Sequence, residues 1–247
     1  MEEGKSTVRA VDRALDILLC FTVKTDWAMS EIAEHVGLHK STVHRMLATL
    51  EDKGFITRDA ATDRYHLGLK VWELSANLSR SDDQATIWLP EMVRLRDRLG
   101  ETVSIYVRDG TERIRMQAVQ SNHPVRRVAP VGVRLPLYAG ASSKVLIAYS
   151  DQATQESIMR ARTWMTAVDT EHYREQLQEV AAQGYATSFE ERELGVAALS
   201  APIFNREGKL AAALSVSGPS SRLTEAVMQS YAPIVMEAAK RMGTMIR

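Results

Sequence analysis

A basic, hydroxyl-rich segment lies near the amino terminus, at residues 37–47 (GLHKSTVHRML). If a helix begins at residue 40, the apolar side chains at 43, 46, 47 and 50 form one stripe and face a core. The other side of that helix then offers its polar residues to solvent or to a partner: Lys40, Ser41, Thr42, His44, Arg45 and Thr49. Cations and hydroxyls near a helix N-terminus suit phosphates and base edges in the major groove of duplex DNA.

These side chains differ in what each can contact on DNA. We expect His44 and Arg45 to reach base edges or phosphates, and Thr42 a thymine methyl group or a phosphate. Lys40 and Ser41 would bind the DNA backbone, where contacts fix position rather than specify sequence. The alternative is a solvated helix face that has no partner.

The flanking segments predict the elements that would position this helix. Apolar periodicity indicates helices at 7–21, 30–36 and 40–52, with a turn at Gly37 between the last two. This order is a helix-turn-helix. In the first helix Val11, Leu15 and Leu18 share one stripe, and Thr7 and Ser30 are expected to cap the first two helices.

Residues 53–68 (KGFITRDAATDRYHLG) follow with the pattern of a β-hairpin. Arg58 and Arg64 are expected near its tip, as the wing of a winged helix that lies over the adjacent minor groove or backbone. An amphipathic helix then begins at Leu69. We therefore expect a winged helix-turn-helix over 1–68 and a linker helix over 69–80.

The remainder, 81–247, has a mixed pattern that indicates an α+β ligand-sensing domain. Helices are expected at 84–99, 140–149, 151–161, 169–183 and 224–245. Extended segments are expected at 102–107 and 112–120, joined by a turn, and at 185–189, 196–204 and 209–217.

Composition restricts the class of protein. The 247 residues carry a formal net charge of zero and 45% hydrophobic residues, which is ordinary for a water-soluble protein. The chain has neither an apolar run long enough to cross a membrane nor a signal-peptide pattern, so we expect a cytoplasmic protein without a membrane partner. The single cysteine, Cys20, lies in an apolar run and is expected in the core. The six histidines show no metal-site spacing, and no cofactor is expected.

Several longer segments together resemble the IclR family of bacterial transcriptional regulators. They are AVDRALDILLCF, MSEIAEHVGLHKSTVHRMLATLEDKGFI, YHLGLKVWEL, LPLYAGASSKVLIAY and GVAALSAPIFNREGKLAAALSVSGPSSRLT, in family order. The resemblance implies a winged helix-turn-helix, a linker helix and a GAF-like α/β domain that binds an effector. It also implies dimers, or dimers of dimers, on palindromic operators.

The resemblance further implies where an effector would bind. The family lines its pocket with the leucine before the proline, here Leu135, and with backbone amides at the next helix start, here Ala141 and Ser142. A helix N-terminus suits a carboxylate. Two serines on one face of a strand could hydrogen-bond that ligand, and neighbouring segments would complete the site: Ser188, Val196, Ala198, Ser215 and Ser217. The alternative is that Ser215 and Ser217 only form hydrogen bonds with nearby backbone groups.

The chain departs from many relatives in this region. Ser143 replaces a glycine before the lysine, Ala198 replaces a polar or thiol side chain of some relatives, and Ser188 replaces an aspartate of others. A less acidic, differently shaped pocket is expected. If HPVRRVAP forms a strand, Arg126 and Arg127 point to opposite faces, and we hypothesise that Arg127 pairs with an anionic effector, with solvent exposure as the alternative.

Together these patterns predict a ligand-responsive transcriptional regulator, a repressor or an activator of catabolic genes, whose effector is a small organic or aromatic acid. One rival is an enzyme that acts on a small organic acid. Against it, no Gly-rich phosphate loop, metal spacing or nucleophile elbow occurs, so no catalytic residue is assigned. The other rival is a ligand-independent architectural DNA-binding protein, for which a filled interior between Leu135 and Ser217 would speak.

Overall fold

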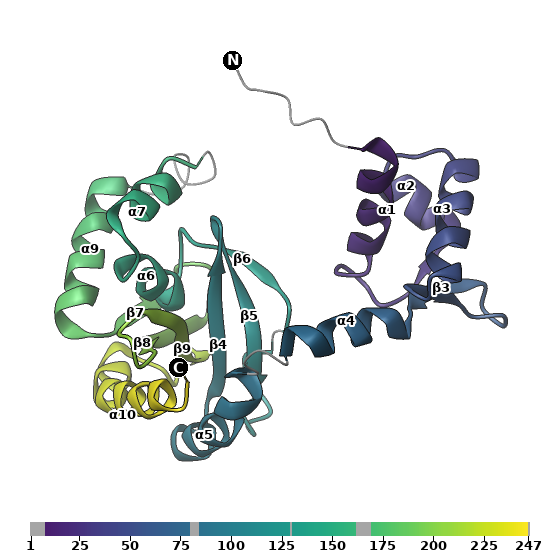
Figure 1. Cartoon of the computed structure of the whole chain (residues 1–247). Helices are drawn as coiled ribbons and strands as arrows, with labels where there is room; N and C mark the ends of the chain where they lie inside the picture. Colours follow the sequence, from purple (N-terminus) through teal and green to yellow (C-terminus); the bar gives the residue numbers. More distant parts are fainter. Residues whose placement is uncertain (1–7, 80–83, 129, 162–168, 247) are drawn as a thin grey trace. The chain divides into compact units, whose positions relative to one another are not determined.

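The computed structural model describes residues 8–79, 84–128, 130–161 and 169–246, which form two compact units. The first unit ends at Asp83 and the second begins at Gln84. Figure 1 shows the elements of each unit. Among the described helices, none is both long enough and apolar enough to cross a membrane.

Three helices form the body of the first unit: α1 (Arg9–Cys20), α2 (Met29–His35) and α3 (Lys40–Asp52). Between α2 and α3 the chain turns at Gly37, whose φ of +65° lies in the left-handed region that favours glycine. The core contains Ile32 from α2, with Val43 and Leu47 from α3. The helix-turn-helix expected from the sequence is therefore present.

Two details of these helices differ from expectation. Val11 and Leu15 are about half exposed (53% and 51%), while Ile17 and Cys20 are buried. Helix α1 carries apolar residues on two faces, and it is the face with Ile17 and Cys20 that packs into the core. Ser30 does not cap α2. The helix begins one residue earlier, and the Glu31 carboxylate accepts a hydrogen bond of 2.8 Å from the amide of Ala28, the N-cap residue. The expected cap Thr7 lies outside the described residues.

The wing is a small antiparallel sheet of β1 (Trp27–Ala28), β2 (Ile56–Arg58) and β3 (Arg64–Leu67), in the order β1-β3-β2. A turn over 59–63 joins β2 to β3. The Asp59 carboxylate stabilises this turn, since it accepts hydrogen bonds from the amides of Ala61 and Thr62 at 2.7 and 3.1 Å. Helix α4 (Leu69–Ser79) follows directly.

A six-stranded antiparallel sheet, in the order β6-β5-β4-β9-β8-β7, is the centre of the second unit as described. Its strands are β4 (Thr102–Asp109), β5 (Glu112–Val119), β6 (Arg134–Pro136), β7 (Ala186–Phe189), β8 (Val196–Phe204) and β9 (Leu210–Pro219). Each expected extended segment forms a strand, and the turn at 110–111 closes the β4–β5 hairpin.

Helices cover both faces of this sheet (Figure 1). On one face, α5 (Gln84–Leu99) and α10 (Glu225–Thr244) bury an apolar core that includes Ile105, Leu199 and Val216. On the other face lie α6 (Ala141–Ala148), α7 (Gln152–Met159) and α9 (Thr170–Gln183). This second face is less uniformly apolar, because successive side chains of a strand alternate between faces and here several are hydroxyls.

Candidate DNA-binding and effector sites

Helix α3 turns its apolar stripe inward and its basic side outward. Val43, Leu47 and Leu50 are buried, Met46 is half-buried, and the polar residues expected to meet DNA are exposed except Thr42, which is half-buried. No described residue forms an ion pair with Lys40 or Arg45, so both cations are available to a partner.

The first turn of α3 is organised by its own side chains. The imidazole Nδ1 of His39, the N-cap residue, lies 2.8 Å from the Ser41 hydroxyl and accepts a 3.4 Å bond from the Ser41 amide. Thr49 donates its hydroxyl to the Arg45 carbonyl at 3.0 Å, one turn back. The turn carries no carboxylate, so nothing in it opposes an anion at the positive end of the helix dipole.

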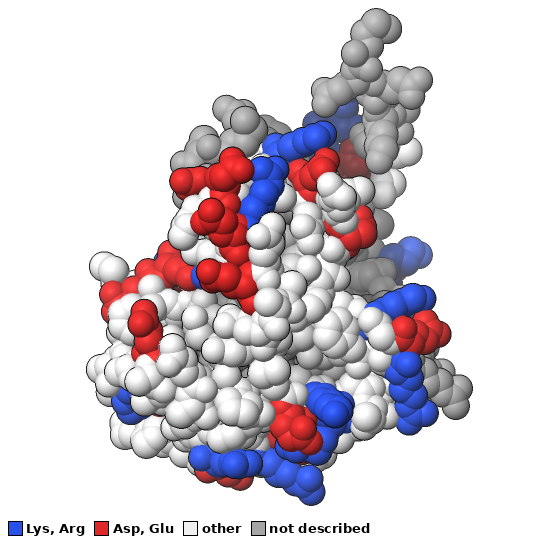
Figure 2. All heavy atoms as spheres, turned by 90° about the vertical axis from the view of Figure 1, so that its left-hand side faces the viewer, with Lys and Arg blue, Asp and Glu red and all other residues white. Residues whose placement is uncertain are grey.

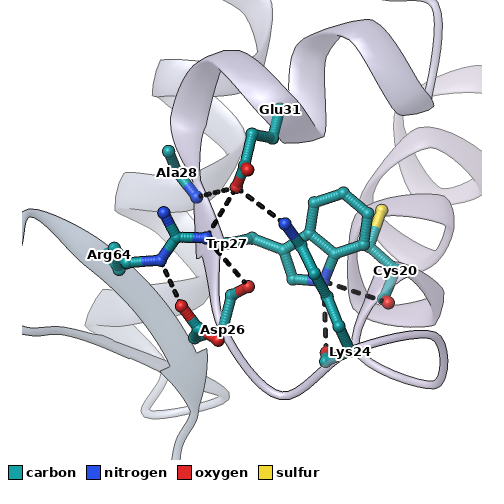
Figure 3. A network of polar contacts seen from close by, with 7 residues as sticks. All are labelled: Cys20, Lys24, Asp26, Trp27, Ala28, Glu31 and Arg64. Atoms are coloured by element: carbon teal, nitrogen blue, oxygen red, sulfur yellow. Dashed lines mark hydrogen bonds and ion pairs between the residues drawn. The ribbon is translucent and has the colours of Figure 1, made fainter.

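Arg58 and Arg64 flank the wing turn, and both are held by carboxylates of the same unit. The Arg58 guanidinium pairs with Asp63, and its backbone amide donates to Glu51 at 3.3 Å. Arg64 pairs with Asp26 and, at 2.8 Å, with Glu31 (Figure 3). The Arg64 side chain thus points toward α2 rather than outward from the wing.

Glu31 is the centre of the contacts drawn in Figure 3. Its carboxylate accepts the Ala28 amide, pairs with Lys24 at 2.9 Å and binds Arg64. These contacts, the Ala28 hydrogen bond foremost, lower the pKa of Glu31 to about 2. Glu31 therefore fastens the wing strand β3 to the start of the helix that precedes α3.

The second unit has a row of hydroxyls on the face that α6 covers. Strand register places Ser215 of β9 beside both Ser104 of β4 and Ser200 of β8. One pair further along, Ser217 lies beside Ala198, which in turn pairs with Ser188 of β7. Residues on four separate segments of chain therefore converge on one polar patch.

A cavity of about 40 Å³ lies over this patch. It is lined by all but one of the expected effector-site residues: Arg127, Ala141, Ser142, Ser188, Val196, Ala198, Ser215 and Ser217. Leu135 is not among the lining residues; it is half-buried on β6 and packs with the apolar cluster below α6. The cavity thus reaches Ser217 but not Leu135. Ser143 is buried behind the cavity and binds the Ala139 carbonyl at 2.9 Å.

Arg127 reaches the cavity from a segment that is not a strand. The described part of 120–133 contains no strand, so the expected alternation of Arg126 and Arg127 does not apply. The Arg127 carbonyl instead accepts a hydrogen bond of 2.9 Å from the Thr102 hydroxyl. The Arg127 side chain is only 17% exposed, so the solvent-exposed alternative is also wrong.

Three further arginines line the cavity, Arg113, Arg115 and Arg192, and the sequence reasoning missed all three. Arg113 and Arg115 alternate with apolar residues on β5, a spacing that puts them on one face of the sheet. Arg115 donates to the Tyr106 hydroxyl at 2.9 Å through Nε. Their spacing of two was a visible signal, but only the register of β5 in the sheet shows that this face is the interior.

Arg113 is 3% exposed and lies directly below the start of α6. Its Nη1 donates to the carbonyls of Pro136 and Ala139 at 2.6 and 2.9 Å, whereas its buried Nε meets no acceptor among the described residues. Burial lowers the pKa of Arg113 to about 10, so the group remains cationic at neutral pH. A buried donor without a partner costs roughly 1–3 kcal/mol, which an acceptor entering the cavity would recover.

Two carboxylates of the β7–β8 loop also line the cavity. Glu191 binds Lys144 at 2.5 Å and accepts the Gly140 amide, at the N-cap of α6, at 3.0 Å. Glu193 binds Arg127 at 2.7 Å and lies 3.7 Å from Arg192. Burial, and then Arg127, lower the pKa of Arg192. Carboxylates of the chain itself therefore bind Lys144 and Arg127 at this site.

A wider groove of about 620 Å³ lies elsewhere on the second unit. Its lining is mostly apolar and includes Tyr149, Phe204, Pro233 and Met236, but none of the expected effector-site residues. Figure 2 shows that the α9 side of this unit has a broad area with few charged side chains, bordered by acidic and basic groups. The described residues hold no cluster of three metal-binding side chains.

Comparison with known proteins identifies both units. Residues 10–60 match the family model of the IclR helix-turn-helix domain, and residues 78–244 match that of the bacterial transcriptional regulator IclR C-terminal domain. The regulator BhcR of Paracoccus denitrificans is 31% identical over 246 residues, which span 98% of this chain and 88% of BhcR. The transcriptional repressor IclR of Escherichia coli is 31% identical over 223 residues, 86% of this chain and 80% of its own.

Solved structures agree. An IclR homologue of Microbacterium hydrocarbonoxydans, crystallised with 4-hydroxybenzoate, superposes with a TM-score of 0.84 at 27% identity, covering 96% of this chain and 99% of its own. The IclR regulator of Alicyclobacillus acidocaldarius gives 0.81 at 27% identity, covering 97% and 99%. A winged helix-turn-helix and a GAF-like domain on one chain define a transcriptional regulator rather than an enzyme. The chain belongs to the IclR family.

Proposed function

We propose that this regulator binds a palindromic operator through α3 and the wing, and that a small carboxylate in the second unit changes its affinity for that operator. Lys40 and Arg45 on the outer side of α3 support the DNA-binding part, because both are exposed and neither pairs with a carboxylate of the described residues. His44, Ser41, Thr42, Thr49 and Arg58 complete the contact surface, and Arg64 positions the wing. Such a protein acts in the cytoplasm, where the DNA lies.

One observation carries the effector proposal: a cation-lined cavity at the start of α6, one of whose lining arginines, Arg113, has a buried Nε without an acceptor among the described residues. The amides of Ala141 and Ser142 begin that helix, where the first N–H groups have no partner within the helix and attract anions. Ser215 and Ser217 supply hydroxyls from the strand opposite. The 4-hydroxybenzoate held by the Microbacterium homologue is a carboxylate, which agrees with this chemistry.

A homodimer, or a dimer of dimers, is part of the proposal. A palindromic operator presents two half-sites about 34–36 Å apart, and two copies of the helix-turn-helix would meet them. The effector acts only through its different affinity for the DNA-bound and free arrangements of the two heads, with α4 as the connection. Genes for catabolism of the acid are the expected targets.

The test is fluorescence anisotropy of the full chain with DNA fragments from its own locus, with and without a panel of carboxylates. We expect one fragment to bind with at least a thousandfold preference over unrelated DNA, and at least one acid to shift that affinity. The control is an unrelated fragment of equal length, measured at the same salt concentration. Binding to no fragment would reject the proposal, and an operator affinity that no acid shifts would favour the architectural alternative.

A further inference from the structure

The wide groove along α10 is separate from the proposed effector cavity. It has a volume of about 620 Å³, and it shares no lining residue with that cavity. Pockets that hold drug-sized ligands measure about 300–1,000 Å³ and are lined mainly by apolar and aromatic side chains with a few polar groups. Both the size and the lining of this groove match that description.

The walls of the groove are fixed by close packing. The rings of Tyr149 and Phe204 meet edge to face with centroids 5.0 Å apart, and the Tyr149 hydroxyl donates to the Val180 carbonyl at 3.1 Å. Helix α10 lies so close to the end of β8 that a Cβ added at Gly243 would clash with the Phe204 carbonyl oxygen. The groove is therefore preformed, and no described element has to move to open it.

The chemistry of the groove changes along its length. Residues 233, 236, 240 and 244 of α10 all line it, and because they are three or four positions apart they form one row about 16 Å long. Pro233 and Met236 begin this row, and Lys240 follows. At its end the Arg206 guanidinium donates to the Thr244 carbonyl at 3.1 and 2.9 Å. One end is thus apolar, and the other carries both cations of the lining.

These two cations are available to a partner. Neither Lys240 nor Arg206 forms an ion pair with the described residues. The lining includes one carboxylate, Glu237, and it lies 3.3 Å from the guanidinium of Arg241, which does not line the groove. A ligand with a negative group at this end therefore meets two cations, whereas a positive group would be repelled.

We propose that the groove is a second ligand site, which binds a straight-chain amphipathic carboxylate with the chemistry of a medium-chain fatty acid. The alkyl chain lies along Met236, against the rings of Tyr149 and Phe204. The carboxylate lies between Lys240 and Arg206. Burial of the chain supplies most of the affinity, since an exposed ion pair contributes little. This site does not depend on the proposed function.

Calorimetric titration of the full-length protein with octanoate, decanoate and dodecanoate, each below its critical micelle concentration, tests this inference. Decylamine has the same chain with a positive head, and butyrate has the same head with a short chain. We expect one molecule bound per chain and an affinity that rises with chain length, by up to about fourfold for each buried methylene. Decanoate should bind at least fivefold more tightly than decylamine. Equal affinities for these two, or no saturable binding of the long acids, would overturn the inference.

Two variants locate the bound acid in the groove. Met236→Glu puts a carboxylate in the apolar part and is expected to lower the decanoate affinity at least tenfold. Lys240→Gln should lower it about threefold without lowering the affinity for decylamine. Arg160→Gln, which removes an 80% exposed cation at the end of α7, is the matched control and should change neither. Wild-type decanoate affinity in Lys240→Gln contradicts the inference even if Met236→Glu fails to fold.

The alternative occupant of the groove is a second copy of the chain. Sedimentation velocity of the wild type and of Lys240→Gln and Met236→Glu distinguishes the two occupants. We expect the same mass for all three proteins, with and without decanoate. An oligomer that either substitution dissociates would identify the groove as an interface between copies and overturn the inference.

Discussion

The Glu193 carboxylate lies 2.7 Å from Nη1 of Arg127, so a carboxylate of the chain itself binds a cation that lines the proposed effector cavity. The two residues are 66 positions apart in the sequence. Their pairing keeps a largely buried guanidinium compensated when no external anion is present, since an unpaired buried charge would be costly. In the proposed function, an acid that binds Arg127 would have to compete with Glu193.

Glu31 should make the first unit sensitive to acid. Its pKa is about 2 in the folded chain and near 4.5 when unfolded, so its contribution to stability is complete above about pH 4.5 and is lost as pH falls toward 2. In Glu31→Gln the unfolding midpoint of the first unit should depend less steeply on pH in that window. Thermal unfolding followed by the NMR signal of the Trp27 indole N–H, which donates to the Cys20 carbonyl, measures this at pH 2.5 to 6, and parallel slopes in both proteins would contradict it.

Arg64 should act on DNA binding through the shape of the wing. Its charge is already paired with Asp26 and Glu31, so Arg64→Met should weaken operator binding without releasing fewer counterions. We expect the slope of log affinity on log salt to stay within about 0.3 of the wild type, whereas loss of a phosphate contact changes it by about 0.9. Arg58→Met is the matched comparison on the other wing strand. A full unit of slope lost in Arg64→Met would show a direct phosphate contact instead.

Gly140 should be the glycine on which the effector site depends most. With φ at 99° and ψ at 152° it occupies a region open essentially to glycine alone, and an added Cβ would lie 3.2 Å from Nη2 of Arg113. Gly140→Ala should lower the free energy of unfolding of the second unit by about 2–4 kcal/mol.

Gly37→Ala is the control for backbone strain alone, because that position has positive φ but open space around it. Gly37→Ala should lower the free energy of unfolding of the first unit by about 1 kcal/mol. Urea unfolding of both variants gives the comparison. Equal small losses would show that Arg113 yields to the new methyl group.

The sequence predicted the elements well because apolar periodicity is a local property. Helix α3 begins at Lys40 as expected, and strands β7, β8 and β9 fall within a few residues of their expected bounds. The apolar stripe predicted for α1 is not the face that the structure buries. Val11 and Ile17 both lie in apolar stripes, and only packing against the rest of the first unit distinguishes them.

The sequence pattern could not predict ion pairs between residues that are far apart in the chain. Arg64 meets Asp26 across 38 positions, so its inward direction could not be read from the hairpin alone. The family motif found the hydroxyl and amide side of the effector cavity. It gave no sign of Arg113, whose place below α6 depends on strand register and on the path of residues 136–140.

The central claim is that the outer side of α3 binds duplex DNA, and a salt titration of operator binding tests it most directly. Arg45→Ala and Lys40→Ala are compared with Lys209→Ala, which removes an exposed cation from the turn before β9 in the other unit. A residue that holds a phosphate should lower the slope of log affinity on log salt by about one, and a residue that reads a base should cost about 1–3 kcal/mol on the operator and relax specificity. We predict one of these effects for Arg45→Ala, a reduced slope for Lys40→Ala and neither for Lys209→Ala. Wild-type affinity, slope and specificity in both α3 variants would contradict the account.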